Sequence, residues 1–129
     1  MNFIRRIENI FEKYIEGFFN RRFSSEVQPV EIARQLVKEM EEGKSIGISK
    51  IYAPNVYNVY INSKDFEKIT SYSQPISKEL VAYLQKQAQE KRYTILGVPI
   101  LEIQQDDQLG RGAFRIVARF SEPLPQEEI

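Results

Sequence analysis

An amphipathic helical pattern over residues 27–44 is the feature of the sequence that most constrains the fold. In "VQPVEIARQLVKEMEEGK" apolar residues recur at intervals of three and four, at Val30, Ala33, Leu36, Val37 and Met40. This spacing gathers the side chains on one side of an α-helix, and that side needs a second layer to cover it. Pro29 suits the first turn and Gly43 is typical of a helix end. Candidate capping residues are Ser24, Ser25 and Gln28.

Two strand-like runs follow this helix. Residues 45–52 ("SIGISKIY") and 56–62 ("VYNVYIN") flank Pro54 and Asn55, which are turn formers. We therefore predict a β-hairpin. One face of its second strand should carry Tyr57, Val59 and Ile61.

The chain then returns to helical spacing. Residues 64–69 predict a short helix, for which Ser63 is a candidate cap. A longer helix should begin at Pro75 and end near Arg92. Its apolar stripe consists of Ile76, Leu80, Val81, Leu84 and Ala88.

Two more strands are predicted near the carboxyl end. Residues 93–104 are typical of a long strand in which Gly97 and Pro99 mark a bulge or an edge. A turn over residues 106–112 leads to a returning strand over residues 113–120. One side of this strand carries Phe114, Ile116, Ala118 and Phe120.

These elements predict one α+β domain over residues 1–120. Residues 1–23 have the spacing of an amphipathic helix, so the order is α-α-β-β-α-α-β-β. We expect a two-layer sandwich, in which helices cover one face of a four-stranded, mostly antiparallel or mixed sheet. Residues 121–129 contain prolines and acids without periodicity, which indicates a tail or the start of a linker.

Composition excludes several chemistries. The 129 residues include no His and no Cys, which rules out a Ser-His-Asp or Cys-His mechanism, a disulfide and a Cys-based zinc site. The net charge is zero, so total charge favours neither nucleic acid nor an anionic membrane. We expect no enzymatic activity, cofactor, metal ion or small-molecule substrate. No secretion signal or transmembrane run is visible, so the expected location is the cytoplasm.

The predicted amino-terminal helix is one candidate for a partner-binding surface. Its apolar side includes Phe11, Tyr14, Ile15, Phe18 and Phe19. Such a stripe also fits packing on the helix's own domain, which is the commoner role of an amphipathic face. Both interpretations stay open at this point.

A basic strand is the second candidate surface. Arg111, Arg115 and Arg119, together with Tyr57 or Tyr60 on a neighbouring strand, are residues that contact phosphates and stack on bases. The α-β-β-α order makes a nucleic-acid-binding, KH-like domain the alternative hypothesis. Against it, the sequence lacks a GxxG loop between helices, and alternating charged residues are typical of a solvated sheet face.

Asp106 and Asp107 form an adjacent acidic pair with Glu102 nearby. Carboxylates of this kind hold divalent cations. However, neighbouring side chains on a strand point to opposite faces, and Asp is an ordinary turn residue. We therefore interpret the pair as part of a turn.

Four segments together resemble one known family. They are "VQPVEIARQLVKEMEEGK", "APNVYNVYINSKDFEKI", "ELVAYLQKQAQEKRYTILG" and "EIQQDDQLGRGAFRI", and the most specific parts are "QPVEIA", "PNVY" and the "DD…G.FR" hairpin. They resemble the N-terminal domain of bacterial FHA-domain proteins of the FhaA type, over nearly the whole chain.

The resemblance implies a non-catalytic adaptor domain that contacts other proteins. In that family a linker and a phosphothreonine-binding FHA domain follow this domain, and no FHA domain is present in this sequence. The implied partners are a membrane-associated cell-wall synthesis protein or a component of a Ser/Thr-kinase pathway. Recruitment to the inner face of the membrane is a further expectation.

Overall fold

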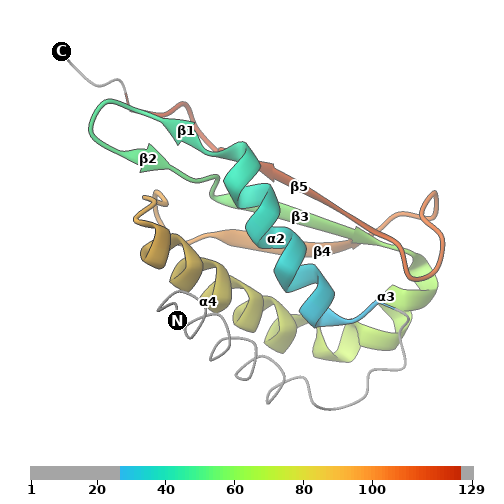
Figure 1. Cartoon of the computed structure of the whole chain (residues 1–129). Coiled ribbons are helices and arrows are strands. Elements are labelled where there is room, and N and C mark those ends of the chain that lie inside the picture. Colours follow the sequence, from blue (N-terminus) through green and yellow to red (C-terminus); the bar gives the residue numbers. More distant parts are fainter. Residues whose placement is uncertain (1–26, 126–129) are drawn as a thin grey trace, which may run out of the picture.

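The computed structural model describes residues 27–125 (Figure 1). Along this part of the chain a helix is followed by three strands, then by two helices joined by a 3₁₀ turn, and then by two strands. In order they are α2 (Pro29–Gly43), β1 (Ser45–Ile46), β2 (Ile51–Tyr52), β3 (Val56–Ile61), α3 (Ser63–Ile69), the 3₁₀ turn η1 (Thr70–Tyr72), α4 (Ser73–Lys91), β4 (Ile100–Gln105) and β5 (Phe114–Arg119).

The main sheet has three strands in the order β4-β3-β5. β3 pairs with β4 in parallel and with β5 antiparallel, so the sheet is mixed. α2 contacts β5, α4 contacts β4, and the two helices contact each other on the same side of the sheet (Figure 1). The predicted α+β class, with helices over one sheet face, is confirmed.

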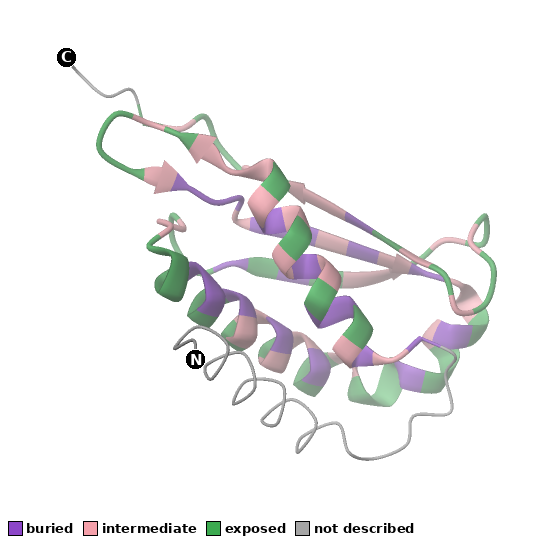
Figure 2. Cartoon of the chain, viewed as in Figure 1, coloured by how far each residue is buried: buried purple, intermediate pink, exposed green. Residues whose placement is uncertain are grey.

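The core lies between this helical layer and the sheet. Tyr57, Val59 and Ile61 of β3 are fully buried, as the period-2 pattern predicts. From the helices, the buried side chains include Ala33, Leu36, Met40, Ile76, Leu80, Leu84 and Ala88. Figure 2 shows buried positions along both α2 and α4. The stripe of α2 therefore builds the core.

Local sequence signals place the ends of the helices. Gln28 is the N-cap of α2, and its backbone N–H donates to Glu31 Oε2 at 3.5 Å. α3 begins one residue earlier than predicted and its cap is Asn62 rather than Ser63, because the Asn62 side chain accepts from the Lys64 backbone N–H. α4 ends before Arg92, which has a left-handed φ of 62°.

The predicted hairpin between residues 45–52 and 56–62 is wrong. β1 instead pairs with β2 inside the first of these runs, and the Gly47 N–H donates to the Lys50 carbonyl at 2.8 Å to close the turn. β3 is the central strand of the main sheet and lies between β4 and β5. The five described strands therefore form a two-stranded and a three-stranded sheet, not a single sheet of four.

The predicted long strand over residues 93–104 is shortened to β4. Thr94 makes only an isolated bridge to Tyr52, and the chain then bends before Ile100. Gly97 has a φ of 75°, which is not an extended conformation, and Pro99 has no N–H for a sheet bond. β4 lies at one edge of the sheet, as these two residues predict.

The predicted helix over residues 1–23 lies outside the described residues. The five candidate partner-binding residues between Phe11 and Phe19 lie outside them too. Residues 121–125 form no helix or strand. That residues 121–129 are a tail or the start of a linker stays a prediction.

Candidate interaction surface

Asp106 and Asp107 are used in the turn between β4 and β5. Asp106 accepts from the Gln108 N–H at 3.0 Å and pairs with Arg115 at 3.1 Å. These contacts lower the pKa of the Asp106 carboxyl, the bond from Gln108 contributing most. Asp107 accepts from the Ser63 N–H at 3.3 Å. Both carboxylates are therefore engaged in the turn, and within residues 27–125 no cluster of acidic side chains has the arrangement of a metal site.

Two further polar residues fix the same turn to the start of α3. Asn62 Nδ2 donates to the Leu109 carbonyl at 2.7 Å, and Asp65, only 1% exposed, accepts from the Gly112 N–H at 2.8 Å. Gly112 has a φ of 84°, which favours glycine. Sequence reasoning missed both roles. Asn62 lies directly before a helix, which is a usable capping signal, whereas nothing in the sequence marks Asp65 as buried.

Arg115 and Arg119 lie on the sheet face opposite the helices. The Arg115 guanidinium lies 4.3 Å from the centre of the Tyr60 ring, which faces it across the β3–β5 register. Its ion pair with Asp106 balances its charge. Arg119 is exposed on the same face, and Arg111 is exposed in the turn before β5. The structure thus brings Arg115 and Tyr60 together.

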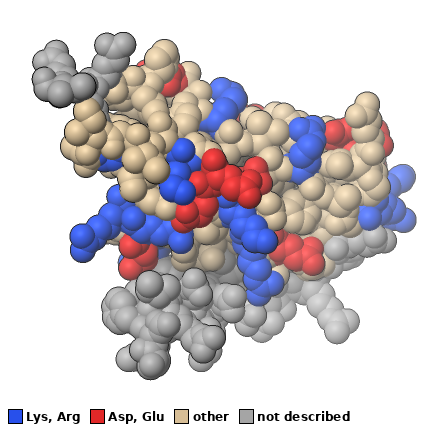
Figure 3. Space-filling view, turned by 45° about the horizontal axis from the view of Figure 1, so that its top comes forward, with Lys and Arg blue, Asp and Glu red and all other residues tan. Residues whose placement is uncertain are grey.

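A mixed-charge cluster joins the carboxyl ends of α2 and α4. Glu41 accepts from the Tyr93 hydroxyl at 2.7 Å and pairs with Lys91 at 3.0 Å and Lys44 at 3.5 Å. Burial raises the pKa of Glu41, but these contacts outweigh it, so the pKa is lowered. Burial and the Glu41 charge raise the pKa of Tyr93 to about 12. Figure 3 shows a group of acidic side chains with Lys and Arg next to it.

Asn55 holds three separate segments together. Its Nδ2 donates to the Leu96 carbonyl at 3.2 Å and to Ser121 Oγ at 2.9 Å, and its Oδ1 accepts from the Ser121 N–H at 2.9 Å. Its backbone N–H donates to the Arg119 carbonyl at 3.2 Å. Asn55 therefore joins the start of β3 to the loop after α4 and to the chain after β5.

The β1–β2 hairpin and the loop that Asn55 holds carry most of the exposed large apolar residues. Ile46 is 73% exposed and Ile48 is 70% exposed, on the β1–β2 hairpin; Val98, in the loop before β4, is 72% exposed. Leu96 and Ile100 are also exposed. The Tyr52–Thr94 bridge fastens the hairpin to the loop. We call this surface, made by Ile46, Ile48, Leu96, Val98 and Ile100, the apolar end.

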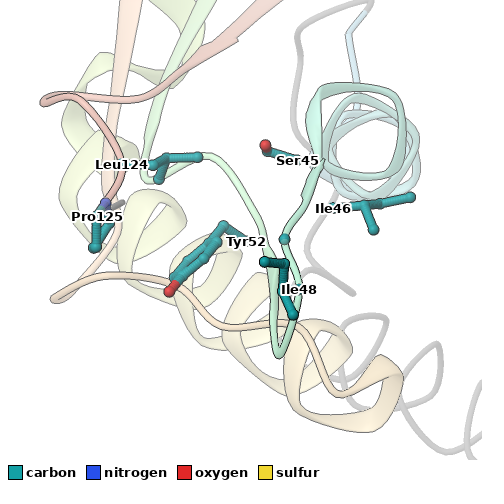
Figure 4. Close-up of a pocket in the computed structure, with 7 residues that line it drawn as sticks. Ser45, Ile46, Ile48, Tyr52, Leu124 and Pro125 are labelled. Carbon is teal, nitrogen blue, oxygen red and sulfur yellow. The ribbon is translucent and has the colours of Figure 1, made fainter. Parts of the chain in front are cut away.

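Two hollows adjoin the apolar end. One, of about 340 Å³, lies between the hairpin residues Ser45–Ile48 with Tyr52 and the chain at Leu124 and Pro125 (Figure 4). The other, of about 370 Å³, is lined by Asn55, Leu96 and residues 120–125. Leu124 borders both. Large apolar side chains that lie exposed on segments fastened to each other mark a candidate contact site for another molecule.

The fold and this surface define a small two-layer α+β domain with exposed apolar side chains at one end. None of the described helices combines the length and apolarity needed to cross a membrane. The chain belongs to the family described as FhaA, N-terminal domain, whose model matches residues 4–117. This match confirms the resemblance seen in the sequence.

This chain is similar to a known protein and to a solved structure. The FHA domain-containing protein FhaA of Mycobacterium tuberculosis is 26% identical over 113 residues, which cover 87% of this chain and 21% of that protein. The chain therefore spans about a fifth of that relative's length. A solved structure described as Rv0020c_Nter has a TM-score of 0.69 and 24% identity, and the match covers 88% of this chain and 80% of that one. The second likeness supports the fold.

Proposed function

We propose that this chain is a non-catalytic protein-interaction domain, which acts as an adaptor in an FHA-containing signalling protein. The observation that carries the proposal is the apolar end, where five large apolar side chains lie exposed on segments fastened to each other. Membership of the FhaA N-terminal domain family supports it. Association with a partner that covers such a surface is favourable, because apolar area is removed from water.

The apolar end is held in shape before any partner arrives. Asn55 bonds to the loop at Leu96 and to the chain at Ser121, and the hairpin is closed by its own turn. Binding on a preformed surface costs little ordering of the backbone, so more of the burial energy remains as affinity. We expect the apolar end to form the centre of an interface of about 800 Å² per partner.

The cellular setting of this adaptor is part of the proposal. A relative named as an FHA domain-containing protein supports a linked FHA domain in the full-length protein. The partners proposed are a membrane-associated cell-wall synthesis protein or a Ser/Thr-kinase pathway component. The domain would act in the cytoplasm and be recruited to the inner face of the membrane. The apolar residues between Phe11 and Phe19 are proposed as a second contact for a partner.

Nucleic-acid binding is the alternative function, and the structure favours it less. The arginine that stacks on an aromatic ring, Arg115, already pairs with Asp106, and Glu102 lies on the same face of the sheet. A phosphate would have to compete with the Asp106 carboxylate for Arg115. The alternative predicts binding that weakens steeply with salt and depends on Arg119.

The test is affinity capture from a detergent lysate of the native bacterium, with residues 1–129 as bait. The baits are the wild type, the double variant Ile46→Ser/Ile48→Ser and the control Lys64→Glu, which changes an exposed residue of α3. We expect envelope or kinase-pathway proteins to be captured by the wild type and the control, to be lost with the double variant, and to be unaffected by RNase. Equal capture by all three baits, or capture that RNase abolishes, would contradict the proposal.

A further inference from the structure

β5 is a free edge of the main sheet. The strand order β4-β3-β5 leaves its outer side without a neighbouring strand within residues 27–125. Alternate backbone N–H and C=O groups of an edge strand point away from the sheet. Proteins often protect such an edge with proline or a bulge, but the six residues of β5, "FRIVAR", contain no proline or glycine and pair with β3 in unbroken register.

The uncompensated positive charge along this edge belongs to Arg119. Arg115 and Arg119 point to the same side, and four residues of strand separate them by about 13 Å. Arg119 is exposed and has no ion pair among the described residues, whereas Arg115 shares its charge with Asp106. The opposite edge strand, β4, carries Glu102 at the equivalent face and is preceded by Pro99. An added strand that carries acidic side chains is therefore more favourable beside β5 than beside β4.

The same edge leads to the hollow beside the hairpin. The chain continues from Arg119 to Leu124 and Pro125, which form one wall of the 340 Å³ hollow, and Ile48 and Tyr52 contribute to the other side (Figure 4). A space of this size holds one large apolar side chain. An extended segment that follows β5 toward its carboxyl end would arrive there.

We propose that an extended acidic peptide segment of a partner protein adds to β5 as a fourth strand. Its backbone would bond to the free edge, a carboxylate would meet Arg119, and one apolar side chain would fill the hollow. Strand addition of this kind takes affinity from main-chain hydrogen bonds and specificity from alternate side chains. The inference rests on the proposed function, because it names the chemistry of the partner segment.

The experiment selects phage-displayed random decapeptides on immobilised residues 1–129 and then measures synthetic peptides by fluorescence anisotropy. We expect selected sequences to alternate acidic with apolar residues. N-methylation of alternate backbone amides should weaken binding by roughly tenfold or more, because several edge bonds are lost. Arg119→Glu should weaken it by roughly fivefold or more, and Lys64→Glu should not.

Three results would overturn the inference. They are an absence of selected peptides, selection of basic peptides, and affinity that N-methylation leaves unchanged. Tighter binding of a 12-nucleotide single-stranded RNA that needs Arg119, without peptide binding, would favour the nucleic-acid alternative. If peptide binding fails while capture of a protein still depends on Ile46 and Ile48, this inference fails alone. If both fail, the proposed function fails too.

Discussion

Replacing Asn55 by alanine removes the side chain that holds the apolar end in shape. The change deletes three hydrogen bonds, two to Ser121 and one to the Leu96 carbonyl. The two backbone bonds, from the Asn55 N–H to Arg119 and from the Ile100 N–H to the Asn55 carbonyl, remain possible. The variant therefore tests the side chain alone.

The expected cost follows from the number of bonds lost. A hydrogen bond between neutral groups contributes about 1 kcal/mol, so three of them give an upper value of about 3 kcal/mol. Asn55 is half-buried, so water can replace part of this loss. We expect Asn55→Ala to lower the free energy of unfolding by about 1.5–2.5 kcal/mol. The amide of Ser121, released from Asn55 Oδ1, should exchange faster.

Urea unfolding and amide hydrogen exchange measure the two effects. The matched control is Asn58→Ala, in β3 just after Asn55, because no hydrogen bond of its side chain contributes to the joint. The control should stay within about 0.5 kcal/mol of the wild type. If Asn55→Ala also stays within that range and Ser121 exchange does not change, our account of this joint is wrong.

Three other changes give results that do not depend on the apolar end. Gly43→Ala should cost about 1–3 kcal/mol in thermal unfolding, because the added Cβ would lie 2.8 Å from Pro54 Cγ; an unchanged melting temperature would contradict this packing. Tyr57→Phe should leave the free energy of unfolding unchanged or raise it by up to about 1 kcal/mol, because the buried Tyr57 hydroxyl has no hydrogen-bond partner among the described residues. A lower free energy of unfolding would contradict this and show that the hydroxyl does form a hydrogen bond. The lowered pKa of Glu41 predicts stability that is full above its unfolded pKa and is lost as pH falls through the folded value. The raised pKa of Tyr93 predicts stability that is full below pH 10.0 and is lost as pH rises toward about 12. Glu41→Gln should move the Tyr93 absorbance titration to lower pH, and an unmoved titration would contradict the contact.

The helices could be predicted because their signals are local. The stripe of α2 and its Pro29 lie within one stretch of sequence, and the structure buries Leu36 and Met40 as that stripe requires. The same holds for α4, whose residues Leu80 and Leu84 pack in the core. Helical period is set by neighbours three and four residues apart, so no distant contact is needed to read it.

The choice of strand partners could not be read in this way. Pro54 and Asn55 resemble a hairpin turn, but Pro54 is buried against Gly43 and Asn55 bonds to segments 41 and 66 residues away. Alternation specifies which face of β3 is buried, and says nothing of which strands flank it. The true turn, over residues 47–50, contains a single glycine and is therefore a weaker turn signal in the sequence than Pro54 with Asn55.

The candidate surface was also beyond sequence reasoning. Ile46, Ile48 and Val98 belong to runs that are typical of buried strands, and the pattern alone places them in the core. They are exposed because the hairpin and the loop before β4 lie beyond the end of the main sheet (Figure 1). In contrast, period 2 alone puts Arg115 and Arg119 on one face of the last strand, and the register with β3 agrees.

The most direct test of the adaptor proposal is photo-crosslinking in living cells of the native bacterium. A photoreactive phenylalanine analogue would replace Ile48 at the apolar end or, as the control, Lys64 on α3, in the full-length protein. The proposal predicts a discrete crosslinked protein with the probe at position 48, lost when Ile46→Ser is added, and none with the probe at position 64. Equal crosslinking from both positions, or none from position 48, would contradict it.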